Sequence, residues 1–224
     1  MIRIRRSEDE PVAVWDLPVR LSHWVSAFLV AGCYVTWQRN WMGWHVRLGE
    51  TLLALVIFRL SWAVWGSENA RFRAFLAPPG AVFHHLATIF RREPDHAAGH
   101  NPAGGWMVVA LLALLLGETL SGIYVNNDIA NESALTELVP APIANAIDDL
   151  HFWLWWALAA AVAVHVLAIA VYALAKGQNL VRPMLTGVKT LPPAIPRPRF
   201  APRQRALWLL ALSVAAALIL AWGL

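Results

Sequence analysis

Four histidines lie beside or within apolar stretches of this chain and have the side chains best suited to metal chemistry: His23, His45, His151 and His165. His151 and His165 share one stretch. Their spacing corresponds to about 21 Å along an α-helix, and to a rotation that returns to within roughly 40° of its start. Both imidazoles should therefore face one side of that helix. Because a neutral imidazole is a good ligand for iron, one helix can offer an iron ligand near each membrane surface.

The elements that must position these histidines are predicted to be transmembrane helices. A hydrophobic content of 58% and a mean hydropathy of +0.51 exclude an ordinary water-soluble domain. Each of five apolar stretches is close to the roughly 20 residues that a bilayer core requires. They are residues 21–37, 46–65, 106–125, 152–175 and 206–222. We expect an all-α integral membrane protein, a four-helix transmembrane bundle with a fifth, carboxyl-terminal helix, since uninterrupted apolar runs do not suit barrel strands.

The distribution of basic residues predicts the orientation in the membrane. All but Arg39, Arg47 and Arg59 of the 18 Lys and Arg residues lie in the amino-terminal arm, in the connection between the second and third helices, and after the fourth helix. The connection between the third and fourth helices has no basic residue and carries acidic ones. We therefore expect a multi-pass protein of the bacterial cytoplasmic (inner) membrane, with its amino terminus cytoplasmic and its carboxyl terminus periplasmic. The net charge of +4 then reflects membrane insertion and does not indicate nucleic-acid binding.

With this topology the histidines fall at two depths, and the depths predict pairs. His23 and His165 should lie near the inner surface, and His45 and His151 near the outer surface. Each pair could clamp the iron of one haem between helices. A single cysteine excludes a CxxCH attachment site, so two non-covalent haem b groups are expected. Interfacial anchoring beside a tryptophan is the alternative for three of the histidines, whereas His165 lies deep in an apolar run where a polar group needs a function.

Three further residues within the predicted helices could serve the cofactors. Arg59 should lie at the inner level and could pair with a haem propionate, although snorkelling to the surface is an alternative. Gly49 follows His45 by one turn, and its missing side chain would let a flat macrocycle or another helix approach. Glu118 is costly within an apolar run unless it relays protons to a quinone or makes an interhelical hydrogen bond.

Three segments of the sequence resemble the bacterial cytochrome b561 and nickel-iron hydrogenase b-type cytochrome family. The first is the opening sequence from Val14 to Trp24, the second runs from Gly99 to Gly105, and the third is the stretch from Leu150 to His165. The resemblance covers roughly residues 12–186. It implies a four-helix di-haem membrane cytochrome that exchanges electrons with quinones and with hydrogenases, cytochromes c or other periplasmic partners. His100 lies in one of these segments, and the resemblance assigns it no ligand role.

The chain divides into four parts by composition. Residues 1–11 are a cytoplasmic arm, and residues 12–186 are the cytochrome b561-like domain. Residues 187–205 are a basic, proline-rich linker that we expect to be extended and to lie against anionic lipid. Residues 206–224 form an additional transmembrane helix without a His or a charged residue, which favours a packing or partner-docking role.

The function favoured by these patterns is electron transfer through two b haems between the quinone pool and a periplasmic redox partner, such as a hydrogenase or a cytochrome c. An electron-transfer subunit is favoured over a self-contained enzyme. One alternative is direct oxidation of a small molecule such as superoxide, with quinone as the acceptor. A non-haem metal site lacks the closely spaced histidines it would need, and a haem-free assembly anchor leaves His165 unexplained.

Overall fold

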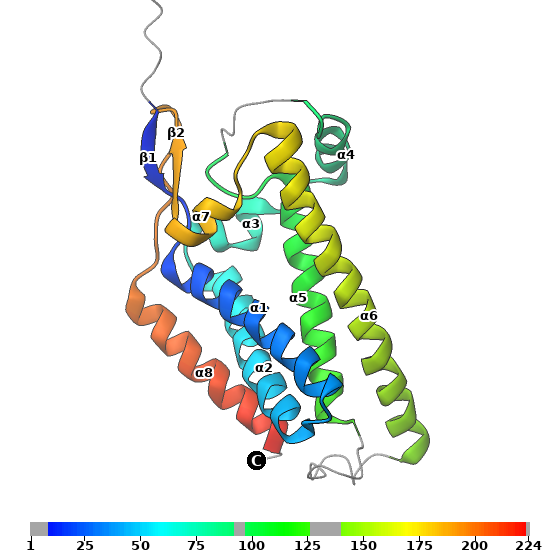
Figure 1. The fold of residues 1–224 in the computed structure, drawn as a ribbon. Coiled ribbons are helices and arrows are strands. Elements are labelled where there is room, and N and C mark those ends of the chain that lie inside the picture. Colours follow the sequence, from blue (N-terminus) through cyan, green and yellow to red (C-terminus); the bar gives the residue numbers. More distant parts are fainter. Residues whose placement is uncertain (1–8, 92–96, 126–139, 223–224) are drawn as a thin grey trace, which may run out of the picture.

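Long helices dominate the computed structural model, which describes residues 9–91, 97–125 and 140–222 (Figure 1). The five long helices are α1 (Leu17–Gln38), α2 (Met42–Trp65), α5 (Pro102–Ile123), α6 (Ala141–Val171) and α8 (Arg203–Trp222). Helix α2 packs against α1, α5 and α8, and α5 packs against α6. Figure 1 shows α6 and α8 on opposite sides of the bundle. The all-α fold predicted from the sequence is confirmed.

Four of the five long helices are long and apolar enough to cross a membrane: α2, α5, α6 with its continuation, and α8. Helix α1 is also long, with 22 residues, but it is less apolar. The reason is local, because Arg20, Ser22 and His23 all lie in its first two turns. The first predicted span is therefore a helix as expected, although its hydropathy is lower than that of the other four.

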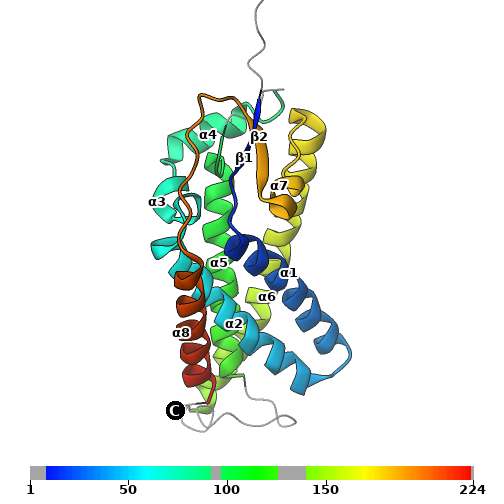
Figure 2. The same cartoon turned by 90° about the vertical axis from the view of Figure 1, so that its left-hand side faces the viewer.

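The shorter elements gather at one end of the bundle, which we call the sheet end (Figures 1 and 2). They are η1 (Glu68–Ala70), α3 (Phe72–Phe75), α4 (Pro79–Ala87), the π-helical turn η2 (Tyr172–Lys176) and α7 (Val181–Thr186). Helix α6 runs directly into η2 and ends at Gly177, whose φ of 72° is a left-handed conformation that favours glycine. The opposite end, where α1 turns into α2, is called the far end.

A two-stranded antiparallel sheet at the sheet end joins two segments that are far apart in the sequence. Strand β1 (Glu10–Ala13) pairs with β2 (Val188–Leu191), so that Glu10 lies opposite Leu191 and Ala13 opposite Val188. The sequence analysis did not predict this sheet. Each strand has only four residues, and such short strands are paired by tertiary contacts and not by a periodic pattern that the sequence displays.

The proline-rich segment at 187–205 is extended, as predicted, but it lies against the protein itself. Arg197 forms an ion pair of 2.8 Å with Glu10. The backbone N–H of Arg199 donates to the carboxylate of Glu68 at 3.0 Å, and the backbone of Ala201 donates to Ser67 at 2.9 Å. Arg199 and Ala201 therefore bind protein groups through their backbone, while the side chains of Arg197 and Arg199 stay 71% and 91% exposed, and the contact with lipid stays a prediction.

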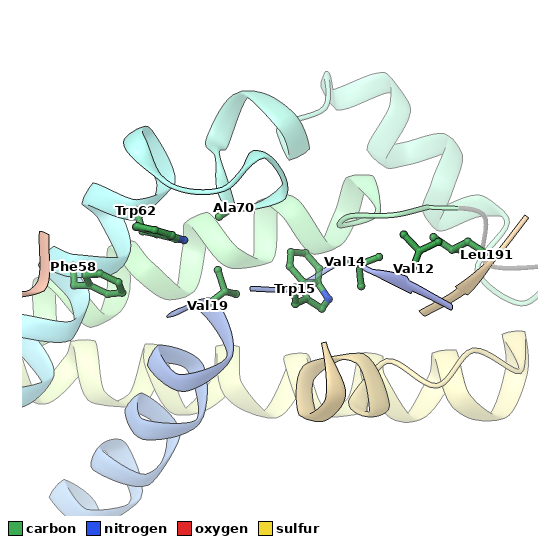
Figure 3. Packing of buried hydrophobic residues seen from close by; sticks show 8 residues of the cluster. All are labelled: Val12, Val14, Trp15, Val19, Phe58, Trp62, Ala70 and Leu191. Carbon is green, nitrogen blue, oxygen red and sulfur yellow. The ribbon is translucent and has the colours of Figure 1, made fainter. Parts of the chain in front are cut away.

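A compact hydrophobic cluster holds the sheet end together (Figure 3). Its members come from β1, the turn after β1, α1, α2, η1 and β2, and they are Val12, Val14, Trp15, Val19, Phe58, Trp62, Ala70 and Leu191. Val14, Trp62 and Leu191 are completely buried. The cluster therefore packs the start of α1 against the end of α2, and it covers the site that lies between these helices and α6.

Candidate functional site

The structure brings together the two histidines predicted at the inner level. His23 on α1 and His165 on α6 have ring centroids 6.3 Å apart, with an interplanar angle of 56°. The two helices contribute one ligand candidate each, although the residues are separated by most of the chain. We call His23 and His165 the sheet-end pair.

The second predicted pair is also formed. His45 near the start of α2 and His151 on α6 have ring centroids 6.4 Å apart, with an interplanar angle of 88°. We call them the far-end pair. Helix α6 therefore contributes one histidine to each pair, as the spacing of its two histidines predicts.

Both separations suit two imidazoles that share one iron. A metal–nitrogen bond to histidine is about 2 Å long, so two imidazoles on opposite sides of one metal have ring centroids roughly 6 Å apart. A macrocycle also needs space between the helices. A Cβ atom added at Gly49 would meet nothing within 4 Å, so the structure gives no support to helix packing at this glycine. The residues present therefore fit haem.

Hydrogen bonds at the far-end pair determine which ring nitrogen is free. His45 Nδ1 lies 2.9 Å from the backbone carbonyl of Cys33, and His151 Nδ1 lies 3.0 Å from the carbonyl of Glu118. Because a carbonyl only accepts hydrogen bonds, each Nδ1 must carry the proton. The Nε2 lone pair of both rings is then available to a metal, and the carbonyls orient the rings as is usual for histidine ligands.

Gly122 on α5 provides the room that the His151 ring needs. A Cβ atom at this position would lie 3.0 Å from His151 Cε1, which is tighter than almost all real contacts. The hydroxyl of Ser121 lies 3.0 Å from His151 Nδ1 on the same turn. Close approach of another helix is the role that a glycine within a predicted span suggests, but the sequence does not show that the His151 ring is what Gly122 meets, because the contact exists only once α5 and α6 are packed together.

Glu118 lies beside the far-end pair. Its side chain is 13% exposed, one carboxylate oxygen is 3.5 Å from His151 Nε2, and the other is buried without a hydrogen-bond partner. The sequence analysis gave Glu118 two possible roles, a proton relay and an interhelical hydrogen bond. The structure shows a hydrogen bond between α5 and α6, which the Glu118 backbone carbonyl accepts from His151. The proton relay to a quinone stays a prediction.

Arg59 lies at the sheet-end level, as predicted. It is close enough to Asp16 and His23 for their charges to interact, and its Nη1 is buried without a hydrogen-bond partner. A snorkelling side chain would expose this nitrogen to water. The buried Arg59 nitrogen could instead donate a hydrogen bond to a haem propionate, as the sequence analysis considered.

Asp16 is a positioning residue that the sequence analysis missed. Its side chain accepts a hydrogen bond from the backbone of Val19 at 2.8 Å and so caps the amino terminus of α1. Its second oxygen accepts from Trp62 Nε1 on α2 at 2.9 Å. The sequence held a signal for the cap, since an Asp followed by Leu-Pro is typical of a helix start. Only packing shows that the same carboxylate binds the neighbouring helix.

His100 lies at the sheet end, just before α5, and is largely covered by protein, with its Nδ1 atom buried. Its ring centroid is 4.6 Å from that of Trp15 and 4.9 Å from that of Phe75. Burial lowers the pKa of His100 to about 3, and the charges of Arg59 and Lys189 act in the same direction. The imidazole is therefore neutral at physiological pH and carries one N–H donor.

A compact site for a bare metal ion is not found among the described residues. No group of three or more His, Cys, Asp or Glu side chains there could hold one ion. The histidines meet only as pairs, and a pair of axial ligands is what haem iron takes from a protein when its macrocycle supplies the other four.

The fold and the paired histidines define a class, the helical membrane proteins that hold a cofactor between their helices. Comparison with known proteins gives the family. The family model described as prokaryotic cytochrome b561 matches residues 14–187, and the chain belongs to this family. It is therefore a multi-pass membrane b-type cytochrome of electron transport, and its cofactor is haem b.

Two curated relatives are similar over most of their length. A protein of Bradyrhizobium diazoefficiens is 26% identical and covers 79% of this chain and 85% of its own. One of Rhizobium leguminosarum bv. viciae is 24% identical and covers 80% of this chain and 89% of its own. Both are named "Probable Ni/Fe-hydrogenase B-type cytochrome subunit". No solved structure matches the chain.

Proposed function

We propose that the protein binds two b haems and carries electrons across the membrane between the quinone pool and a periplasmic redox partner. The observation that carries this proposal is the pairing of four histidines at two levels of one bundle, with ring separations of 6.3 and 6.4 Å. Each haem supplies one-electron chemistry at its iron when bound. Two haems, one above the other, would provide a path from one membrane surface to the other.

The protein's own residues hold and orient these cofactors. The four histidines would bind the two haem irons, and the Cys33 and Glu118 carbonyls keep the protons of His45 and His151 on Nδ1. Gly49 leaves space for a macrocycle next to His45. Arg59 would neutralise a propionate of the haem between His23 and His165.

The names of the two relatives support a hydrogenase as the periplasmic partner. A cytochrome c is the other candidate, and its basic surface would suit the acidic connection before α6. Most of that connection, with Asp128, Glu132 and Glu137, lies outside the described residues, whereas Asp148 and Asp149 lie on α6. If charge guides docking, the rate of electron transfer to the partner should fall as the salt concentration rises.

A count of haems per chain tests the proposal. The protein purified in mild detergent should give two b haems per chain in a pyridine haemochrome assay. His23→Ala or His165→Ala should remove one haem, and His45→Ala or His151→Ala the other, because an axial ligand is lost in each case. His84→Ala is the matched control, since His84 is exposed on α4. A wild-type chain without haem from haem-replete cells would refute the proposal.

Redox titration then assigns the two haems to the two pairs. Each alanine variant should leave one redox component, and the two variants of a pair should lose the same component. If His23→Ala and His165→Ala lost different components, the pairing by depth would be wrong even with two haems present.

A further inference from the structure

The sheet end contains several buried nitrogen atoms that have no hydrogen-bond partner. Besides Nε of Arg20, they are Nδ1 of His23 on α1, Nη1 of Arg59 on α2, and Nδ1 of His100 in the loop before α5. Buried polar groups in proteins are nearly always hydrogen-bonded, and each exception calls for an explanation. The shared explanation offered by the structure is a group with acceptor atoms between these elements.

The His100 ring contacts two aromatic rings. It lies between the Trp15 and Phe75 rings, with centroid distances of 4.6 and 4.9 Å. Gly105 on α5 touches Phe75 so closely that a Cβ atom would lie 2.4 Å from the Phe75 carbonyl oxygen. These contacts restrict the rotation of the imidazole.

The loop that carries His100 is tied to the rest of the sheet end. The Asn69 amide donates to the carbonyl of Val14 at 3.0 Å and to that of Ala98 at 2.8 Å. Lys189 on β2 donates to the carbonyl of Ala97 at 3.0 Å. The loop is therefore hydrogen-bonded both to Asn69, which also binds the residue after β1, and to Lys189 on β2.

The surroundings of His100 favour an anion. The charges of Arg59 and Lys189 act on His100, and Arg59 also acts on His23. Asp16 is the carboxylate that acts on Arg59. Its oxygens already accept hydrogen bonds from Val19 and Trp62. A second carboxylate would satisfy the unpartnered donors and balance the positive charge.

We infer that His100 donates a hydrogen bond to a propionate of the haem held by His23 and His165, and that Arg59 pairs with the propionates of the same haem. The inference rests on the proposed haem at the sheet-end pair. His100 is then a cofactor-binding residue contributed by the loop before α5. It would bind the propionate edge of the macrocycle, while His23 and His165 would bind the iron.

The test removes the donor and the acceptor separately. The full-length chain is prepared without haem and titrated in detergent with haem b or with its dimethyl ester, in which both propionates are blocked. His100→Leu removes the donor, His100→Gln keeps an N–H group, and His84→Leu is the control at an exposed histidine. The wild-type chain isolated from haem-replete cells is first assayed for two haems, which tests the proposed function by itself.

We expect the ester to bind the sheet-end site about tenfold or more weakly than haem b in the wild type, as loss of a charge-assisted hydrogen bond implies. His100→Leu should weaken binding of haem b by a similar factor and weaken binding of the ester much less, because the ester carbonyl is an uncharged acceptor. His100→Gln should recover part of the affinity, and His84→Leu should match the wild type.

Two results would overturn the inference while the haem count stays at two. One is an equal loss of affinity for haem b and for the ester in His100→Leu, which would mean that the residue only packs. The other is an unchanged affinity for haem b in both His100 variants. The midpoint potential of the sheet-end haem is a second readout, and it should differ from the wild type in His100→Leu more than in His100→Gln.

Discussion

Single hydrogen bonds decide what each histidine of this cytochrome can do. The carbonyls of Cys33 and Glu118 force the protons of His45 and His151 onto Nδ1, which leaves the Nε2 lone pair of each ring free to bind a metal. At the sheet-end pair, His23 Nδ1 is buried without such a partner. The two histidine pairs therefore differ in the hydrogen bonds of their Nδ1 atoms, although their ring separations are nearly equal.

A prediction at this scale concerns Gly122. Gly122→Val should push the His151 ring out of place, because a Cβ atom there would lie 3.0 Å from His151 Cε1. We expect the far-end haem to be lost from most molecules and the sheet-end haem to be retained, as measured by haem content and redox titration. Gly43→Val is the matched control, since a Cβ atom at Gly43 meets nothing within 4 Å. Equal haem loss in both variants would contradict this role for Gly122.

At the scale of elements, α6 carries one histidine of each pair, and the starts of α1 and α2 carry the other two. This makes the beginning of α1 critical, because His23 lies two turns after the cap residue Asp16. The Asp16 carboxylate also binds Trp62, and so it sets how α1 and α2 meet. A similar cap begins α5, where the Asn101 side chain accepts from Gly104 at 2.8 Å, directly after His100.

Asp16→Ala should weaken the start of α1. We expect a loss of about 1 kcal/mol or more in stability from the missing cap, together with lower occupancy of the sheet-end haem. Asp16→Asn should lie between the wild type and Asp16→Ala, because an amide caps a helix well but has one oxygen for two donors. Thermal unfolding in detergent and haem content measure the two effects. If the Asn variant were the worse of the two, the capping argument would fail.

At the scale of the whole molecule, the segment after α7 binds the sheet end to α8. Strand β2 pairs with β1. The backbone N–H groups of Arg199 and Ala201 then donate to the side chains of Glu68 and Ser67 at η1, and α8 packs on α2. The hydrogen bonds from Arg199 hold the pKa of Glu68 below its usual value. We call residues 188–201, from β2 to the start of α8, the brace. The family match ends at residue 187, so the brace lies beyond the part of the chain that the family model covers.

Leu191→Ala should show how much the brace contributes. Leu191 is completely buried in the cluster at the sheet end, and emptying such a position costs about 2 to 4 kcal/mol. We expect a clear fall in the Tm of the purified protein. Leu185→Ala is the control, since Leu185 on α7 is 58% exposed. An equal change in Tm for the two variants would show that β2 adds little to stability.

The orientation in the membrane is a second prediction at this scale. In a Cys33→Ser background, a cysteine placed at the exposed Arg199 should react with a membrane-impermeant thiol reagent only from the cytoplasmic side. A cysteine placed at the exposed Pro142, at the far end, should react only from the periplasmic side. The reason is the concentration of Lys and Arg in the segments of the sheet end. The opposite labelling pattern would reverse the topology.

The sequence by itself determined the all-α membrane fold and the pairs His23 with His165 and His45 with His151. This was possible because apolar length and helical spacing are local properties that translate directly into depth and facing direction. Tertiary structure alone decided the β1–β2 sheet, the contact of Asp16 with Trp62, the room at Gly122 and the packing around His100. These features depend on groups that are far apart in the sequence, and no local pattern records which side chains meet when helices pack.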